Sequence, residues 1–194
     1  MSDIAFAQLT RAGLGRGTNE DLVAHWAFED GFVFAVADGL GNADGGQVAS
    51  TLAIEVLGRE LAETPPDMPM IRRLRRALQA ANVEIYQKRV TVPELREMGT
   101  TLTVTAAFGG TLVAAHVGDC RLWLLRQHRL VQLTKDHTWA WEQIEAGVLS
   151  SEQARTHPRR YSLPRCLGHE LIFSIDLLSM DLRAGDVLVR KPAK

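Results

Sequence analysis

The sequence predicts an α+β domain in which helices pack on antiparallel sheet. Three observations support this prediction. Short runs typical of strands occur before and after the middle of the chain, two long segments between them follow the helical period, and most of the strands are joined by tight turns. Antiparallel strands need only a short turn, whereas parallel strands need a crossover connection. We therefore expect antiparallel sheet with helices on its outer faces.

The first predicted elements are two strands and a helix. Residues 22–28 and 32–37 are apolar runs separated by Glu29-Asp30-Gly31, whose Asp-Gly pair is typical of a tight turn. A glycine-rich loop over 38–46 follows. From 48 to 61, apolar residues recur at helical spacing and predict one buried helical face.

A proline-rich break over 65–69 separates this helix from a second one. Asp67 is a candidate N-cap for the second helix, whose apolar stripe runs over 71–85. The arginines between 72 and 76 lie mostly off the stripe, and we expect them on a solvated helix face.

Two hairpins follow the helices. Residues 100–108 and 111–117 flank Gly109-Gly110, and a second pair of strands spans 121–125 and 129–133.

The last part of the chain is less regular. A polar helical segment is predicted from 134 to about 155, and a strand near 171–175. The turn Ala184-Gly185-Asp186 then leads into the start of a strand at 187–189.

Composition excludes several classes of protein. The chain has 194 residues, of which 46% are hydrophobic and 23% charged, with a formal net charge of -1. This is typical of one soluble domain, here residues 1–194, and a near-neutral charge provides no field that attracts nucleic acid or an anionic membrane.

We expect a cytoplasmic protein. No signal peptide is visible at the N-terminus, and the uncharged stretch 98–118 is interrupted by glycines and threonines, unlike a membrane span. Cys120 and Cys166 are expected to be reduced thiols.

Acidic side chains lie where predicted strands end. Asp38 follows the run 32–37, and its carboxylate beside the Gly39 carbonyl forms a hard-oxygen donor set suited to Mg²⁺ or Mn²⁺. An Asp-Gly turn without a ligand explains this segment about equally well. Asp119 ends the strand 111–117 in the same way.

A second group of charges precedes the first strand. Glu20 and Asp21 lie at its start, and Arg16 is four residues before Glu20. A planar guanidinium is suited to binding the oxygens of a phosphate group. Alone, these residues are typical of surface charge, and spacing does not show that they converge with Asp38.

Several motifs, taken in order, resemble the bacterial metal-dependent Ser/Thr protein phosphatases of the type 2C class (PPM). The resemblance covers essentially the whole chain. The motifs are Arg16-Gly-Thr-Asn-Glu-Asp21, Val36-Ala-Asp-Gly-Leu-Gly41 with Gly45-Gly46, Met98-Gly-Thr-Thr101, His116-Val-Gly-Asp-Cys-Arg121, Leu133-Thr-Lys-Asp-His137, His157-Pro-Arg-Arg-Tyr-Ser-Leu163 and Ala184-Gly-Asp186.

The resemblance implies a four-layer α-β-β-α sandwich of two antiparallel sheets, with a flap at about 137–160. It also implies a centre of two Mg²⁺ or Mn²⁺ ions, to which a third site can be added. These ions activate water to hydrolyse phosphoserine and phosphothreonine. The implied partners are phosphorylated proteins and a Ser/Thr kinase.

The resemblance also assigns roles to residues. Arg16, Glu20 and Asp38 match catalytic positions, and Arg16 also matches the arginine that binds the substrate phosphate. The metal positions matched are Glu20, Asp21, Asp38, Gly39 and Asp119.

The sequence departs from the family pattern after Asp186. Family members continue into a Ser-Asp-Gly motif and a later Asp-Asn pair, whereas this sequence reads Val187-Leu-Val-Arg-Lys-Pro-Ala-Lys194. We therefore expect a domain that lacks the last strands and helix of the sandwich, with an exposed sheet edge. Two divalent ions carry four positive charges, and few carboxylates remain to bind them. We therefore expect weak metal binding and low turnover for these 194 residues.

Two further functions stay open from the sequence. The chain is alternatively a non-catalytic relative that binds phosphoproteins or regulates a kinase through Arg16 and the retained loop. The third hypothesis is an unrelated binding module with a sandwich fold. The order of the motifs along the chain disfavours it.

Overall fold

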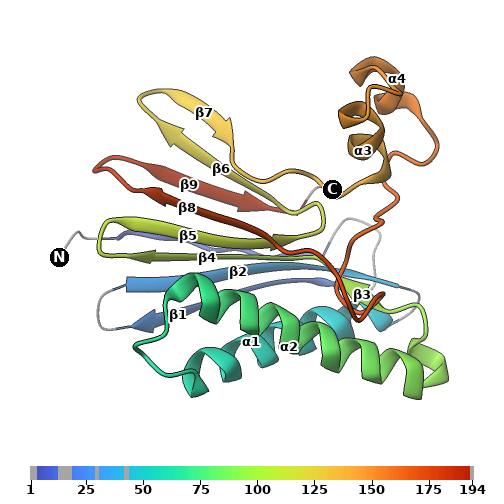
Figure 1. Cartoon of the computed structure of the whole chain (residues 1–194), viewed down its shortest axis with the longest axis horizontal. Coiled ribbons are helices and arrows are strands. Elements are labelled where there is room, and N and C mark those ends of the chain that lie inside the picture. Colours follow the sequence, from blue (N-terminus) through green and yellow to red (C-terminus); the bar gives the residue numbers. More distant parts are fainter. Residues whose placement is uncertain (1–3, 13–18, 29–30, 42–43, 193–194) are drawn as a thin grey trace.

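The fold consists of two antiparallel sheets and a pair of long helices, as Figure 1 shows. The computed structural model describes residues 4–12, 19–28, 31–41 and 44–192. Arg16, Glu29, Asp30 and Asn42 are among the residues outside this description.

The larger sheet has the strand order β1-β2-β4-β5-β8, with the short β3 also paired to β2. Every pairing in it is antiparallel. The bounds are β1 Asp21–Phe28, β2 Gly31–Leu40, β3 Gly99–Thr100, β4 Leu102–Phe108, β5 Thr111–Val117 and β8 Asp176–Asp181.

The smaller sheet has the order β7-β6-β9 and is also antiparallel. Its strands are β6 Arg121–Arg126, β7 Arg129–Gln132 and β9 Val187–Lys191. The helices of the described residues are α1 Gly45–Glu63, α2 Met70–Thr91, the 3₁₀ turn η1 Pro93–Leu95, α3 Trp139–Glu145 and α4 Ser151–Thr156.

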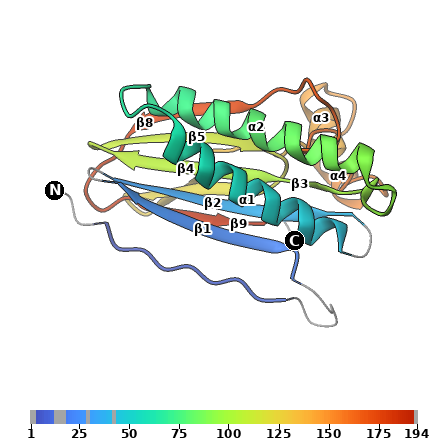
Figure 2. The same cartoon turned by 90° about the horizontal axis from the view of Figure 1, so that it is seen from below.

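Helices α1 and α2 lie side by side across one face of the larger sheet (Figure 2). Side chains alternate between the two faces of a strand, so every second residue of β2 and β4 points toward the helices. The buried residues of this core include Val33, Ala35 and Ala37 of β2, Leu102, Val104 and Ala106 of β4, and Val56, Leu57, Leu74 and Leu78 of the helices.

The smaller sheet packs on the other face of the larger sheet. A second apolar cluster joins them, and it contains Leu112 and Ala114 of β5, Leu122 of β6, Leu178 and Met180 of β8, and Leu188 of β9. The described residues thus form a helix layer and two sheet layers. Figure 1 shows α3 and α4 standing at one end of the sheets, and no described helix covers the outer face of the smaller sheet.

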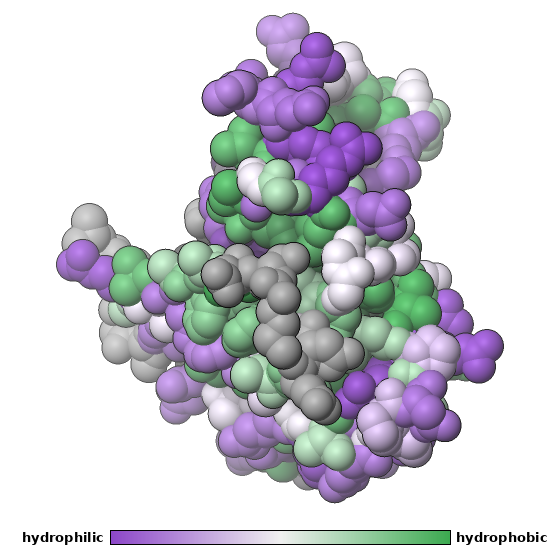
Figure 3. Space-filling view, turned by 90° about the vertical axis from the view of Figure 1, so that its left-hand side faces the viewer, coloured by the Kyte–Doolittle hydropathy of each residue, from purple (hydrophilic) through white to green (hydrophobic). Residues whose placement is uncertain are grey.

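The smaller sheet exposes apolar side chains on strands that form its edges. β7 and β9 each pair on one side only within the described chain. Figure 3 views the hairpin end of the sheets and shows apolar surface between polar side chains. The exposed large apolar side chains on these edge strands are Leu130 and Val131 of β7 and Val187 and Val189 of β9, and Leu125 of the central strand β6 is also exposed. This agrees with the expected exposed edge, a feature that favours association with other chains.

The strands and helices predicted from the period are confirmed with bounds shifted by a few residues, but four details differ. Asp67 does not cap α2: the helix begins at Met70 with Pro69 at the N-cap and no side-chain cap. Arg73 is buried rather than solvated, because its Nη2 donates to the Leu61 carbonyl at 2.6 Å and joins the two helices.

The other two differences lie near the end of the chain. The helical segment after 134 is two short helices, α3 and α4, instead of one. The strand predicted at 171–175 is wrong, because pairing with β5 begins only at Asp176, opposite His116. Asn82 of α2 instead holds this stretch as a loop, donating to the Glu170 carbonyl at 2.8 Å.

No helix in the described part of the chain is long and apolar enough to cross a membrane.

An ion pair fixes the turn between β8 and β9. Arg126 donates to both carboxylate oxygens of Asp186, at 2.8 and 2.6 Å, and the Arg183 N–H donates to the same carboxylate. These hydrogen bonds, with that of Arg126 foremost, lower the pKa of Asp186 from 3.8 to about 2.

Replacing Asp186 should therefore lower stability in a pH-dependent way. A depressed carboxyl pKa stabilises the fold above the ordinary pKa, and this contribution is lost as pH falls through the folded value. We expect Asp186→Asn to melt below the wild type at pH 7, with the difference shrinking from about pH 4 toward pH 2. Thermal unfolding followed by circular dichroism across this range checks it, and a difference independent of pH would contradict the assignment.

Candidate functional site

The loop after β2 depends on a close approach of two glycines. A Cβ on Gly39 would lie 2.2 Å from the Gly46 carbonyl oxygen, and a Cβ on Gly46 would lie 2.6 Å from Glu20 Oε1. Only residues without a side chain allow the start of α1 to lie against the end of β2. This packing brings Glu20 to the same place as Asp38 and Gly39.

The β1–β2 pairing places two predicted acids beside each other. Asp21 lies directly opposite Asp38 in the register, and the Gly39 N–H donates to the Glu20 carbonyl at 3.1 Å. Asp38 is only 4% exposed. Glu20, Asp21, Asp38 and Gly39 therefore lie together at one end of the larger sheet.

Two threonines hold the backbone of Asp38. Its carbonyl accepts from the Thr101 N–H at 2.9 Å and from Thr100 Oγ1 at 3.0 Å, while its own N–H donates to Thr101 Oγ1 at 3.1 Å. Both threonines belong to a motif noted in the sequence, but their positioning role was missed there. Their distance along the chain from Asp38 left no local signal for it.

Asp119 reaches this end of the sheet from the turn after β5. Gly118 adopts φ +107°, and a Cβ there would lie 2.4 Å from Thr101. The backbone N–H of His137 donates to the Gly118 carbonyl at 2.8 Å, and the Gly118 N–H donates to His137 Nδ1 at 3.0 Å. Asp119 is 3% exposed, so the turn presents a buried carboxylate.

Cys120 follows Asp119 in the chain and is buried. Its Sγ lies 3.0 Å from Thr101 Oγ1, and burial raises the pKa of the thiol. The carboxylates of Asp38, Asp119 and Asp21 raise it further. The thiol therefore stays protonated and is unsuited to be a nucleophile.

Two buried histidines lie behind the turn. His116 Nε2 donates to the Lys135 carbonyl at 3.0 Å, and its Nδ1 accepts from Thr103 Oγ1 at 2.8 Å. Burial, followed by the neighbouring His137, lowers the pKa of His116 to about 4. Burial also lowers the pKa of His137. Both rings are therefore neutral near pH 7 and support the turn as hydrogen-bonding groups.

Arg16 lies outside the residues that the structure describes, so its contact with a phosphate group stays a prediction. Glu20, Asp21, Asp38, Gly39 and Asp119 are all described.

The donor chemistry of the site fits a hard divalent cation. Carboxylate and carbonyl oxygens are the ligands that Mg²⁺ and Mn²⁺ prefer, and a cation between neighbouring carboxylates reduces their mutual repulsion. Within the described ranges, however, no group of three or more His, Cys, Asp or Glu side chains is arranged around a common point as metal ligands.

Comparison with known proteins shows that the chain is similar to bacterial protein phosphatases. The family model described as "Protein phosphatase 2C" matches residues 15–191. The serine/threonine protein phosphatase PstP of Mycobacterium tuberculosis is 36% identical over 184 residues, which are 94% of this chain and 34% of PstP. The protein phosphatase PhpP of Streptococcus pneumoniae is 32% identical, over 93% of this chain and 74% of PhpP.

Solved structures show the same fold. The crystal structure of M. tuberculosis PstP superposes with a TM-score of 0.81 at 36% identity, covering 94% of this chain and 75% of that one. A structure of the PstP catalytic domain in complex with two manganese ions superposes with a TM-score of 0.76 at 34% identity, covering 93% of this chain and 73% of that one. The chain spans about a third of the length of full PstP.

The family model covers most of the chain, and PhpP is matched over most of its own length. The chain therefore belongs to the bacterial protein phosphatase 2C family of Ser/Thr phosphatases.

Proposed function

We propose that this chain is the domain of a metal-dependent protein phosphatase that hydrolyses phosphoserine and phosphothreonine. The observation that carries the proposal is that Asp21 lies opposite Asp38 in the β1–β2 register, while Thr101 contacts both the backbone of Asp38 and the Gly118 turn that precedes Asp119. Membership of the family supports the reaction class, and a manganese-bound relative supports the choice of cation.

The residues that would hold the cations are Asp38 and the Gly39 carbonyl, with Glu20, Asp21 and Asp119 beside them. When bound, divalent cations activate water and offset charge on the phosphoryl oxygens. Arg16 would bind and orient the substrate phosphate.

The rest of the chain keeps these groups in place. Thr100 and Thr101 fix the backbone of Asp38 through three hydrogen bonds, so the point from which its side chain extends is set before a substrate arrives. The buried Cys120 contacts Thr101 through its sulfur and stays protonated, so it adds no charge beside Asp119.

The substrates in this proposal are proteins that carry phosphoserine or phosphothreonine, and a Ser/Thr kinase is a further partner. An arginine and divalent cations recognise the phosphate group itself, which suits a range of phosphorylated sequences.

A non-catalytic relative that binds phosphoproteins or regulates a kinase is the second candidate. The absence of a preformed ligand cluster in the described residues favours it. The weak metal binding and low turnover expected from the sequence also stay predictions under the first candidate.

Phosphate release from a phosphothreonine peptide tests the two candidates. The phosphatase proposal predicts release in millimolar Mn²⁺ that stops when EDTA removes the metal, with turnover below that of typical family members. Matched reactions with Ca²⁺ control for a general effect of divalent cations on the fold.

Binding of the same phosphopeptide without any phosphate release in Mn²⁺ would instead support the non-catalytic candidate. Release that persists in EDTA would contradict the proposed metal centre.

A further inference from the structure

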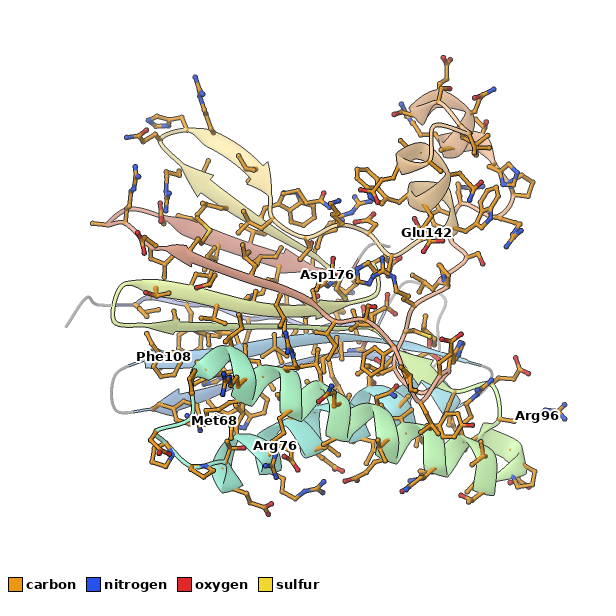
Figure 4. The ribbon with its side chains drawn as sticks, in the orientation of Figure 1. Met68, Arg76, Arg96, Phe108, Glu142 and Asp176 are labelled. Atoms are coloured by element: carbon orange, nitrogen blue, oxygen red, sulfur yellow. The ribbon has the colours of Figure 1, made fainter. Side chains whose placement is uncertain are left out.

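The segment 138–164 contains α3 and α4, and the residues that flank its two ends both contact the carboxylate of Asp176. His137 precedes the segment, and its Nε2 lies 3.2 Å from Asp176 Oδ2. Arg165 follows the segment, and its Nη1 lies 3.4 Å from Asp176 Oδ1. Figure 4 shows Asp176 at the foot of this segment, with Glu142 of α3 above it.

Asp176 is itself anchored to the larger sheet. It is the first residue of β8 and lies opposite His116 in the register with β5. Burial acts to raise the pKa of Asp176, but His137 and Arg165 outweigh it and lower the pKa. The side chain is therefore a carboxylate that interacts with both ends of the segment at once.

His137 joins this carboxylate to the turn that carries Asp119. Its Nδ1 accepts from the Gly118 N–H at 3.0 Å, so in the neutral ring the proton is on Nε2, which faces Asp176. The ring is fully buried, and its centroid lies 4.7 Å from that of His116. Rotation of the ring would leave the buried Gly118 N–H without its acceptor, which is unfavourable.

We infer that His137, Asp176 and Arg165 form a clasp that couples the position of segment 138–164 to the Gly118–Asp119 turn. All three are assigned as positioning residues, which act through the hydrogen bond between His137 and the backbone of Gly118. Displacement of the segment, for example by a docking phosphoprotein, is transmitted to the Asp119 carboxylate. The inference rests on the proposed function only where it assigns Asp119 to the metal centre.

Amide exchange in the metal-free protein tests the coupling directly. The Gly118 amide is the reporter, because its hydrogen bond to His137 Nδ1 is the link in question. In Asp176→Asn we expect faster exchange across 138–164 and also at Gly118. The matched control is Asp186→Asn, which removes a carboxylate from a similar ion pair at the β8–β9 turn and should leave Gly118 unchanged.

A second variant distinguishes the proposed coupling from a general loss of stability. Arg165→Met removes only the contact at the far end of the segment, and we expect a smaller increase in exchange at both places. Faster exchange confined to 138–164 in both variants, with Gly118 as in the wild type, would overturn the inference.

Metal binding provides the readout at the site itself. Manganese titration calorimetry should show about 10-fold weaker binding for Asp176→Asn, the usual effect of removing a residue that orients a ligand. The Asp186→Asn control should bind as the wild type does. If the wild type binds no manganese, the proposed function fails, while the amide exchange still decides whether the clasp exists.

Discussion

Asp38→Asn is expected to abolish Mn²⁺-dependent phosphate release, with a loss of at least about 100-fold, the upper end of the range for residues that only support a ligand. Asparagine has nearly the same shape, and the backbone bonds of residue 38 to Thr100 and Thr101 do not depend on the side chain. The variant should therefore fold. It removes a carboxylate that lies opposite Asp21 in the β1–β2 register, and with it part of the attraction for a divalent cation.

Thermal unfolding gives a second readout that does not depend on turnover. A ligand that binds only the folded state raises its melting temperature, so Mn²⁺ should raise that of the wild type and leave Asp38→Asn unchanged. Asp67→Asn is a suitable control, because Asp67 is an exposed carboxylate in the loop between α1 and α2. Equal activity of Asp38→Asn and the wild type in Mn²⁺ would contradict the proposed centre.

Much of the fold could be predicted because it depends on patterns that repeat along the chain. The Gly109-Gly110 turn between two strand-like runs predicted the β4–β5 hairpin, and helical spacing predicted α1 and α2. Asp38 was predicted just after a strand ending at residue 37, whereas β2 continues to Leu40 and Asp38 lies inside it, near its end.

The predictions failed where contacts between distant residues decide the structure. Residues 171–175 have the composition of a strand, yet Ile172 is 90% exposed, and Asn82 from α2 holds the adjoining backbone. Nothing local to the sequence indicates which apolar run a helix far along the chain will hold as a loop.

The parts of the site that sequence reasoning missed have the same origin. Thr101 supports the backbone of Asp38 across a separation of 63 residues, and His137 contacts Gly118 across 19. Asp176 joins this set only because β8 pairs with β5. A sequence motif can identify such residues, but it does not show which distant residues they contact.

Gly39→Ala is expected to have the largest effect on stability, because the new Cβ would clash with three backbone atoms of Gly46. It would lie 2.2 Å from the carbonyl oxygen, 2.4 Å from the carbonyl carbon and 2.9 Å from the Cα of Gly46. Backbone does not move aside as a flexible side chain does, so α1 must shift away from β2. Overpacking of this kind costs about 3 kcal/mol of unfolding free energy.

Gly109→Ala separates this steric effect from the ordinary effect of replacing a glycine. Gly109 has φ +50° in the β4–β5 turn and no other atom within 4 Å of a Cβ, so alanine there meets strain but no clash. We expect it to cost about 1 kcal/mol. Urea unfolding of both variants measures the difference. Equal losses would show that α1 is not held against the end of β2 by this contact, and that the packing which brings Glu20 beside Asp38 has another cause.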